Sequence, residues 1–488
     1  MHLAAVDLGS NSFRLEIGRV EGAHIARVGY WKETVRLAAG LDDDGRLSRK
    51  AIAIAVDVLA RMNERLRGMD ADQVRAVGTQ TLRQARNIGE FLLEGQSALG
   101  YPIEVISGRE EARLIFEGCS HELPLSDQPR LVADIGGAST ELIVGTGFTA
   151  SSAESFKVGC VNTSMRFFKD GKVDRTSLKK AQVAAAAEIE EAVSLFGSAN
   201  WTEAFGSSGT IGAVSEIVRA EGWTDGTITA DALQRVRSAV LEAGEVGRIR
   251  LAGMKPDRQA VIPGGLAVLT AIFETLGVTS MQPARGGLRV GVLYDLLGRR
   301  EHKDVRHATV ERMMKRFAVD REQAERVRNL ALALYSALRP RASVEMTNRL
   351  HWAAMLHEVG FAVSHSDYHK HAAYLIQHSD LAGFSTTDQE RIATLVLAQR
   401  GNLKKIAEAL QDRERAAKIL ALRLAVIVAH ARRPVEPSHM ALRFGDSIDF
   451  EVDGAWLLAH PLTQYLLEEE AGRWERAGVR FAVKTRRP

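Results

Sequence analysis

The sequence predicts an α/β protein with two duplicated domains around a cleft, followed by a mostly α-helical domain and a small C-terminal α/β cap. Three observations lead to this fold class. Short apolar segments alternate with helical patterns in the first part of the chain, and one motif recurs 127 residues later. From about residue 302, helical periodicity with few glycines replaces the alternation.

The first domain starts with two strands joined by a glycine turn. Leu3–Val6 is short and apolar, and the apolar residues at positions 13, 15 and 17 alternate as in a strand with one buried face. Between them lies an Asp-Leu-Gly turn. The other elements expected here are helices over 51–67 and 109–118 and strands over 74–77 and 102–106.

The recurring motif indicates an internal duplication. A shift of 127 residues superimposes five identical residues within a span of twelve, and each copy has the order strand, Asp-x-Gly turn, strand. Duplication explains this match better than coincidence. The matched pairs are Asp7 and Asp134, Gly9 and Gly136, Ser12 and Ser139, Leu15 and Leu142, and Gly18 and Gly145.

The rest of the chain completes this organisation. We expect an alanine-rich helix near 178–195, a glycine turn at 206–210, and short strands at 447–452 and 479–483 in the cap. The predicted domains are residues 1–117, 118–300, 301–398 and 399–488.

The composition excludes several classes of protein. The 488 residues are 45% hydrophobic and 26% charged, which is ordinary for a globular protein and argues against a disordered, collagen-like or coiled-coil chain. The net charge of +3 does not require a nucleic-acid partner. Two cysteines argue against a disulfide scaffold and fit a reducing cytoplasm. No apolar stretch matches a signal peptide or a membrane span, so we expect a cytoplasmic protein.

The two Asp-x-Gly turns are the strongest candidates for chemistry. A glycine after a strand lets the backbone approach a phosphate, and successive N–H groups in such a turn bind anions. The aspartate at the strand end can hold a hydrated Mg²⁺ ion. A single turn would more simply be a β-hairpin, but two matched copies in duplicated domains favour phosphate binding.

Further candidates lie on the neighbouring segments. Glu110 and Glu111 stand in the first turn of a predicted helix, where acids are common because of the helix dipole, but where a carboxylate could also orient water near a phosphate. Arg83 and Arg36 could bind phosphate or could be ordinary surface charges.

The helical region offers two more features. His357-Glu358 resembles the His-Asp metal pattern of HD-type phosphohydrolases, but the change of carboxylate favours a degenerate, structural HD-like bundle. Residues 400–435 contain nine Lys or Arg and only three acids, a net charge of +6. This segment either binds a polyanion or is a solvated helix face.

Together these motifs resemble those of the exopolyphosphatase / guanosine pentaphosphate phosphohydrolase family, in its long form. The resemblance covers nearly the whole chain and implies the actin-like (ribonuclease H-like) fold, with a C-terminal HD-like region. Its motifs are Ala4–Leu15 (AAVDLGSNSFRL), Gly78–Arg83 (GTQTLR), Ile106–Phe116 (ISGREEARLIF), Asp134–Leu142 (DIGGASTEL), Gly206–Ile211 (GSSGTI) and Leu356–Ser379.

The resemblance also implies roles for individual residues. Glu111 matches the catalytic glutamate, and Mg²⁺ is expected at Asp134 and Glu141, with Asp7 through water. Ala138 departs from the family, which usually has a third glycine there. The expected phosphate-binding residues are Gly9, Ser10, Asn11, Ser12, Arg83, Gly136, Gly137, Ala138 and Ser139. The polyphosphate tract is expected at Lys404, Lys405, Arg423, Arg432 and Arg433.

The activity expected from the resemblance is Mg²⁺-dependent, processive hydrolysis of the terminal phosphoanhydride of inorganic polyphosphate by a homodimer. One alternative keeps the chemistry and takes the 5′-phosphate of guanosine pentaphosphate as substrate. A more distant alternative is an ATP-dependent kinase of the same fold. A non-catalytic polyphosphate-binding protein is disfavoured by the presence of Glu111 and Asp134.

Overall fold

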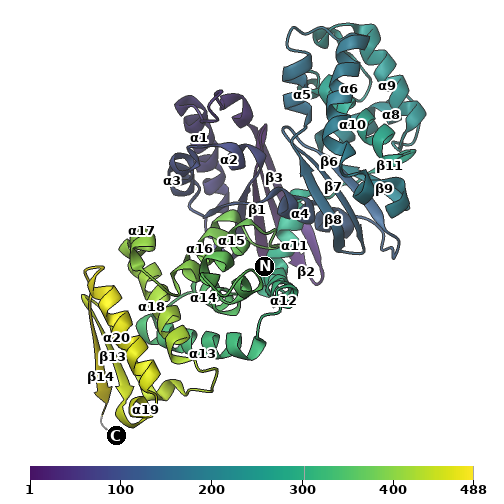
Figure 1. The fold of residues 1–488 in the computed structure, drawn as a ribbon. Coiled ribbons are helices and arrows are strands. Elements are labelled where there is room, and N and C mark those ends of the chain that lie inside the picture. The colour runs from purple at the N-terminus through teal and green to yellow at the C-terminus, as the bar shows by residue number, and fades with distance from the viewer. Residues whose placement is uncertain (302, 487–488) are drawn as a thin grey trace. The chain divides into compact units, whose positions relative to one another are not determined.

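The computed structural model describes residues 1–301 and 303–486, with the side chain of Arg486 outside the description. The chain divides into two compact units, Met1–Val305 and Arg306–Pro488 (Figure 1). Each unit is treated below by itself.

The first lobe of the N-terminal unit is built on a five-stranded sheet in the order β3-β2-β1-β4-β5. β1, β2 and β3 are antiparallel, while β4 and β5 continue the sheet in parallel with β1. The elements are β1 (His2–Leu8), β2 (Ser12–Glu21), β3 (His24–Thr34), α1 (Arg49–Leu66), β4 (Val74–Gly78), α2 (Gln80–Gln84), α3 (Ile88–Leu99) and β5 (Ile103–Val105).

The second lobe repeats this topology. Its sheet has the order β10-β11-β9-β6-β7-β8, in which β6, β7 and β8 are antiparallel and β9 and β11 continue in parallel. This correspondence confirms the predicted duplication. The strands are β6 (Arg130–Ile135), β7 (Thr140–Thr146), β8 (Thr149–Phe156), β9 (Glu203–Ser207), β10 (Ile228–Thr229) and β11 (Ser280–Pro283). The helices are α5 (Cys160–Phe167), α6 (Arg175–Glu190), α7 (Val193–Phe196), α8 (Ser208–Ala220), α9 (Ala230–Ala243) and α10 (Ile262–Leu276).

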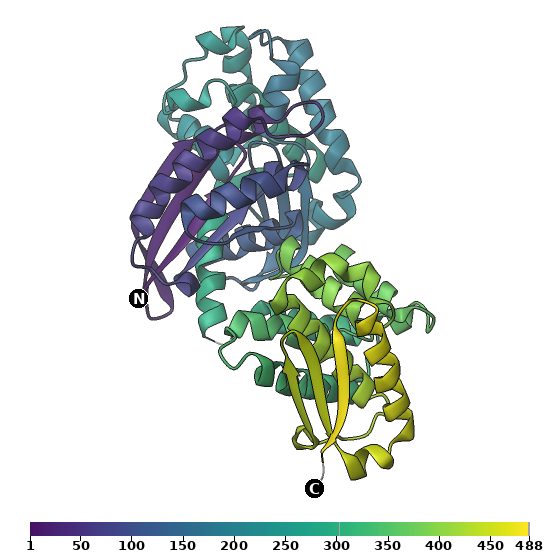
Figure 2. The ribbon, with the colours of Figure 1, turned by 90° about the vertical axis from the view of Figure 1, so that its left-hand side faces the viewer.

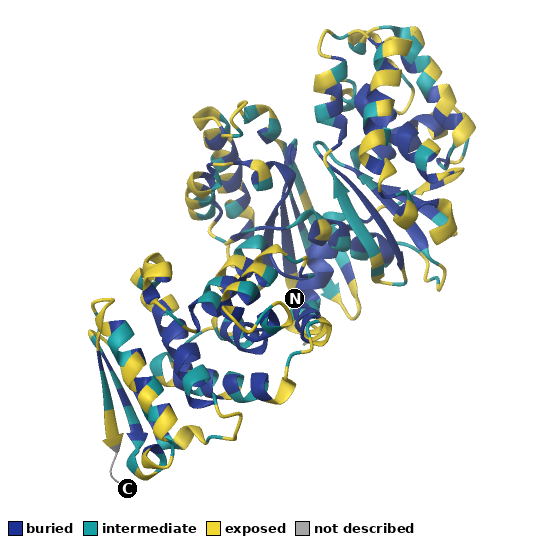
Figure 3. Cartoon of the chain, in the orientation of Figure 1, coloured by how far each residue is buried: buried dark blue, intermediate teal, exposed yellow. Residues whose placement is uncertain are grey.

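The central strands β1 and β6 are buried along most of their length, because helices cover their sheets (Figure 3). Their apolar residues point into the lobe cores. This packing holds both strands in place. The two Asp-x-Gly turns begin at the polar ends of these strands.

Helices α4 (Gly108–Glu122) and α11 (Leu288–Arg300) pack against each other at backbone distance. A Cβ atom at Gly291 would lie 1.8 Å from the carbonyl oxygen of Leu114, and one at Gly118 would lie 2.2 Å from that of Gly287. Only glycine fits such a crossing. The domain boundary predicted at 117/118 falls inside α4, and the predicted domain boundaries remain predictions.

The C-terminal unit is mostly helical and carries a three-stranded sheet in the order β12-β13-β14. Figure 2 shows these strands beside α20, and β13 and β14 coincide with the strands expected in the cap. The helices are α12 (Val305–Arg316), α13 (Arg321–Leu338), α14 (Val344–Met355), α15 (Tyr368–His378), α16 (Thr386–Ala398), α17 (Ala407–Gln411), α18 (Arg413–Val428), α19 (Gly454–Leu458) and α20 (Pro461–Glu475). The strands are β12 (Met440–Phe444), β13 (Ser447–Asp453) and β14 (Arg480–Arg486). Within the described residues, no helix is long and apolar enough to cross a membrane.

Candidate active site

A cavity of about 560 Å³ lies between the two lobes of the N-terminal unit. Both Asp-x-Gly turns form part of its wall, as the sequence predicts. The predicted site residues that line it are Asp7, Gly9, Ser10, Asn11, Ser12, Glu111, Asp134, Gly136, Gly137, Ala138, Ser139 and Glu141.

The two turns have matching geometry and face each other. A Cβ atom at Gly9 would lie 3.0 Å from the carbonyl oxygen of Ser12, and one at Gly136 would lie 3.0 Å from that of Ser139. A Cβ atom at Gly137 would lie 3.7 Å from the side chains of the opposite turn. The backbones of both turns therefore border the same space, which suits a phosphate group. Within the second turn, the N–H of Gly136 donates to the Ser139 carbonyl oxygen at 2.9 Å.

Six carboxylates line the cavity, and four of them are predicted site residues: Asp7, Glu111, Asp134 and Glu141. Burial raises the pKa of Asp134, although its carboxylate accepts a hydrogen bond from Ser207 Oγ. Burial also raises the pKa of Glu141 well above its usual value, and the charges of Glu111 and Asp134 add to this. Such a cluster gains from a cation that offsets its charge.

The donor set of this cluster fits a hydrated Mg²⁺ ion. Carboxylate oxygens are hard ligands, and Mg²⁺ usually keeps several waters while binding one or two carboxylates. Within the described part of the chain, no three His, Cys, Asp or Glu side chains are grouped to hold an ion directly. A hydrated ion keeps several water ligands, so it does not need three protein side chains as direct ligands.

Glu111 lies at the start of α4 and is held by Arg83 from α2. Arg83 Nη1 donates a hydrogen bond to Glu111 Oε2 at 2.7 Å. Burial raises the pKa of Glu111, the charge and hydrogen bond of Arg83 lower it, and the charges of Asp7 and Asp134 raise it again. The net shift is upward, as suits a proton acceptor in a phosphate site.

Two predicted phosphate-binding arginines are placed differently from the expectation. Neither Arg83 nor Arg36 lines the cavity. The Arg83 guanidinium donates to Glu111, to the Gln80 side chain and to the Ile106 carbonyl oxygen. Direct phosphate contact by Arg83 remains a prediction, although these protein acceptors engage most of the donors of its guanidinium.

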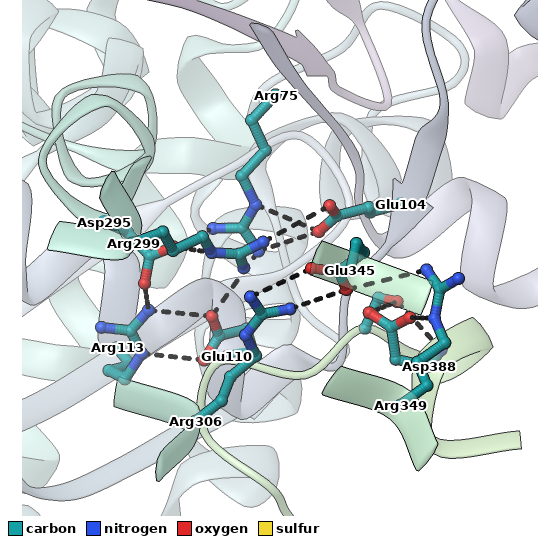
Figure 4. Close-up of polar contacts among 11 residues, drawn as sticks. Arg75, Glu104, Glu110, Arg113, Asp295, Arg299, Arg306, Glu345, Arg349 and Asp388 are labelled. Atoms are coloured by element: carbon teal, nitrogen blue, oxygen red, sulfur yellow. Dashed lines mark hydrogen bonds and ion pairs between the residues drawn. The ribbon is translucent and has the colours of Figure 1, made fainter. Parts of the chain in front are cut away.

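Glu110, the neighbour of Glu111, is buried in a separate ionic network (Figure 4). Arg113 donates to both of its carboxylate oxygens, at 2.8 and 2.9 Å, and Arg113 also binds Asp295 of α11. Asp295 in turn pairs with Arg75 of β4 at 2.8 Å. The network ties α4, α11 and the first sheet together, which fixes the helix turn that carries Glu111.

Four arginines of the cavity wall were not predicted as site residues: Arg14, Arg258, Arg285 and Arg289. Arg14 Nη1 lies 3.7 Å from Asp7 Oδ2, and Arg289 Nη1 lies 3.5 Å from the same oxygen. Arg289 also binds Glu16 at 2.9 Å. Strand alternation could have revealed Arg14, since it falls between the buried Phe13 and Leu15 and so faces the opposite side of β2.

In the C-terminal unit, the predicted polyphosphate tract is only partly exposed. Lys404, Lys405 and Arg433 are exposed, while Arg432 pairs with Asp320 and Glu358 at 2.7 Å each. Arg423 is fully buried and binds Glu470 with two hydrogen bonds. The prediction that Arg423 contacts a polyanion is therefore wrong, because its side chain is inside the core.

His357 of the HD-like motif is buried, and its Nδ1 lies 2.6 Å from the Ala354 carbonyl oxygen. Burial lowers its pKa to about 4. The adjacent Glu358 carboxylate accepts a hydrogen bond from Arg432 at 2.7 Å, and His357 Nε2 lies 3.9 Å from the same oxygen. This arrangement joins neighbouring helices and turns of the unit.

Comparison with known proteins places these features in a family. The pattern described as "Ppx/GppA phosphatase family" matches residues 17–300, and "Ppx/GppA phosphatase, domain III" matches residues 305–471. The guanosine-5′-triphosphate,3′-diphosphate pyrophosphatase of Photobacterium profundum is 38% identical over 475 residues, covering 96% of this chain and 95% of that protein. The protein of the same name from Aeromonas hydrophila is 36% identical over 485 residues, covering 97% of each chain.

A solved structure confirms the fold. The crystal structure of an exopolyphosphatase from Cytophaga hutchinsonii superimposes with a TM-score of 0.56 at 22% identity, covering 61% of this chain and 98% of that chain. At this identity the likeness concerns the fold alone, and it confirms the predicted duplicated actin-like α/β architecture.

Proposed function

Because this chain belongs to the Ppx/GppA phosphatase family, we propose that it hydrolyses the terminal 5′-phosphoanhydride of guanosine 5′-triphosphate 3′-diphosphate. The observation that carries the proposal is the similarity of at least 36% over nearly the full length to relatives named for that activity. This reverses the order of substrates expected from the sequence, where polyphosphate came first.

The cavity supplies the parts that the reaction needs. The backbone N–H groups of both turns hold the terminal phosphates, and Arg14 and Arg289 offset their negative charge. Glu111 accepts a proton from the attacking water as the new bond from oxygen to phosphorus forms. The bond between the terminal phosphorus and the bridging oxygen breaks, so orthophosphate leaves and the nucleotide keeps a 5′-diphosphate.

Mg²⁺ is part of the proposal, with Asp134 and Glu141 as its holders and Asp7 acting through water. A bound ion would supply neutralising charge to the phosphate oxygens. Two hydroxyl groups hold the carboxylates in place: Ser207 donates to Asp134, and Ser155 Oγ donates to Glu141 Oε1 at 2.8 Å.

Inorganic polyphosphate is the second candidate substrate. The observation that favours it is the exposed positive charge of the C-terminal unit, where Lys404, Lys405 and Arg433 belong to a segment of net charge +6. A long polyanion would gain affinity from such charges, whereas a single nucleotide bound in the cavity needs none of them.

Product analysis tests the proposed function. The protein with Mg²⁺ should convert guanosine 5′-triphosphate 3′-diphosphate to guanosine 5′-diphosphate 3′-diphosphate and orthophosphate in equal amounts, as resolved by anion-exchange chromatography. ATP in a parallel reaction should stay largely intact, which separates this activity from that of a kinase or general nucleotidase. Phosphate release from the 3′ end, or shortening of polyphosphate alone, would contradict the proposal.

A further inference from the structure

We propose that Arg83 is a positioning residue for Glu111 and does not bind the substrate. The inference rests on the proposed hydrolytic function, in which Glu111 accepts the proton of the attacking water. The positive charge of this arginine of the 78–83 motif suggests phosphate binding, whereas the inference assigns it the task of holding Glu111 in place.

The first argument is the geometry of the Arg83 side chain. Its Nε and Nη2 atoms both donate to Gln80 Oε1, at 3.2 and 2.7 Å, and Nη1 donates to the Ile106 carbonyl oxygen at 3.0 Å. These contacts fix the guanidinium plane from two sides. The remaining direction of Nη1 points to Glu111 Oε2 at 2.7 Å.

The second argument is the surroundings of Glu111. Its side chain is only 9% exposed, and the carboxylates of Asp7, Asp134 and Glu141 line the same cavity. Like charges in a buried space repel one another, so an unpaired Glu111 would turn away from the cluster or lose its charge. Arg83 provides the opposite charge that holds one Glu111 oxygen in place.

The third argument is that the phosphate-facing charge comes from other residues. Arg14 and Arg289 line the cavity and lie beside Asp7, whereas Arg83 does not line it. Arg83 reaches the reaction only through Glu111. Its removal should therefore impair the chemical step and leave substrate binding largely intact.

The test is a double-mutant cycle with kcat and KM measured separately. Arg83→Ala should lower kcat by about tenfold or more with KM changed less than about threefold. In the Glu111→Gln background, Arg83→Ala should lower the residual kcat by less than about threefold, since the residue on which it acts is already disabled. Arg86→Ala, an exposed arginine two residues beyond the helix, is the matched control and should behave as wild type.

A phosphate-binding Arg83 predicts a different pattern. KM would rise, inhibition by orthophosphate would weaken, and the losses from Arg83→Ala and Glu111→Gln would multiply. That result overturns the inference. If the wild-type protein releases no phosphate from any substrate tested, the proposed function fails instead, so the two failures are distinguishable.

A second variant keeps the inference testable if Arg83→Ala does not fold. Gln80→Ala keeps the arginine charge and removes the acceptor that orients it, so kcat should fall several-fold with KM unchanged. Added guanidinium at millimolar concentration should partly restore kcat of Arg83→Ala, while Arg86→Ala should not respond. An increase in KM for Gln80→Ala, or an absence of rescue in a folded Arg83→Ala, contradicts the positioning role.

Discussion

Lys32 Nζ lies 2.9 Å from Asp257 Oδ2, and this ion pair joins β3 of the first lobe to a short turn of helix, Pro256–Arg258, in the second. Both residues line the cavity between the lobes. The hydrogen bond from Lys32 lowers the pKa of Asp257. A polyphosphorylated substrate that enters the cavity must compete with Asp257 for the Lys32 ammonium group.

Asp257→Asn should lower KM for the nucleotide, because the charge that competes for Lys32 is gone. The decrease should be at most about fivefold, since an exposed ion pair stabilises by at most about 1 kcal/mol. The effect should shrink as salt rises. Lys32→Ala should raise KM instead. Initial rates at two ionic strengths measure this, with the exposed Asp231→Asn, outside the cavity wall, as control. Equal KM for Asp257→Asn and wild type at low salt would refute the competition.

Glu111→Gln should lower kcat by about 10²-fold or more, which is the scale for loss of a general base, with little change in KM. Glu122→Gln is the matched control, since Glu122 is an exposed acid on the same helix. Glu110→Gln is unsuitable as a control because Glu110 is buried and bound by Arg113. A Glu111→Gln variant with near-normal kcat would remove Glu111 from the mechanism.

Asp134→Asn and Glu141→Gln should each raise the Mg²⁺ concentration needed for half-maximal rate, since each removes a hard oxygen charge from the cavity. Chelation of the metal should abolish the rate of the wild-type protein, and added Mg²⁺ should restore it. The measurement is the rate as a function of free Mg²⁺. Identical Mg²⁺ curves for the two variants and the wild type would exclude these residues as holders of the ion.

Arg423→Ala should destabilise the C-terminal unit by about 3 kcal/mol, the lower end for a broken buried ion pair, because the buried Glu470 carboxylate keeps only Arg473, at 3.2 Å, as a charged partner. Replacement of both residues by methionine should cost much less, since no buried charge remains. Urea unfolding of the full chain measures both effects. A loss below about 1 kcal/mol for Arg423→Ala would show that Arg473 alone compensates the charge of Glu470.

The duplicated fold and both Asp-x-Gly turns could be predicted because their signals are local. These signals are an aspartate at a strand end, a glycine after it and a matched second copy. They determine the backbone geometry of the turns locally, so the prediction needs no contact between distant residues. The sheet orders and the placement of Asp7 and Asp134 in one cavity follow from that duplication.

The roles of charged side chains could not be predicted in the same way. Sequence shows that Arg83 and Arg423 are charged, but their partners Glu111 and Glu470 are set by packing, whereas the pair of Glu110 and Arg113 follows from helical spacing. Two of these pairs join residues 28 and 47 positions apart, beyond the reach of helical spacing. Arg14 lies in a strand that the alternation of residues 13, 15 and 17 predicts, and this alternation places it on the face opposite to Phe13 and Leu15.

The proposed preference for the nucleotide over polyphosphate is measured by the ratio of the kcat/KM values of the two substrates. Both substrates should be assayed with the same preparation, salt and Mg²⁺, and orthophosphate release should be followed. We expect guanosine 5′-triphosphate 3′-diphosphate to be favoured by at least about tenfold, because a site that recognises the nucleotide discriminates against a chain without a base. A ratio that favours long-chain polyphosphate would contradict it.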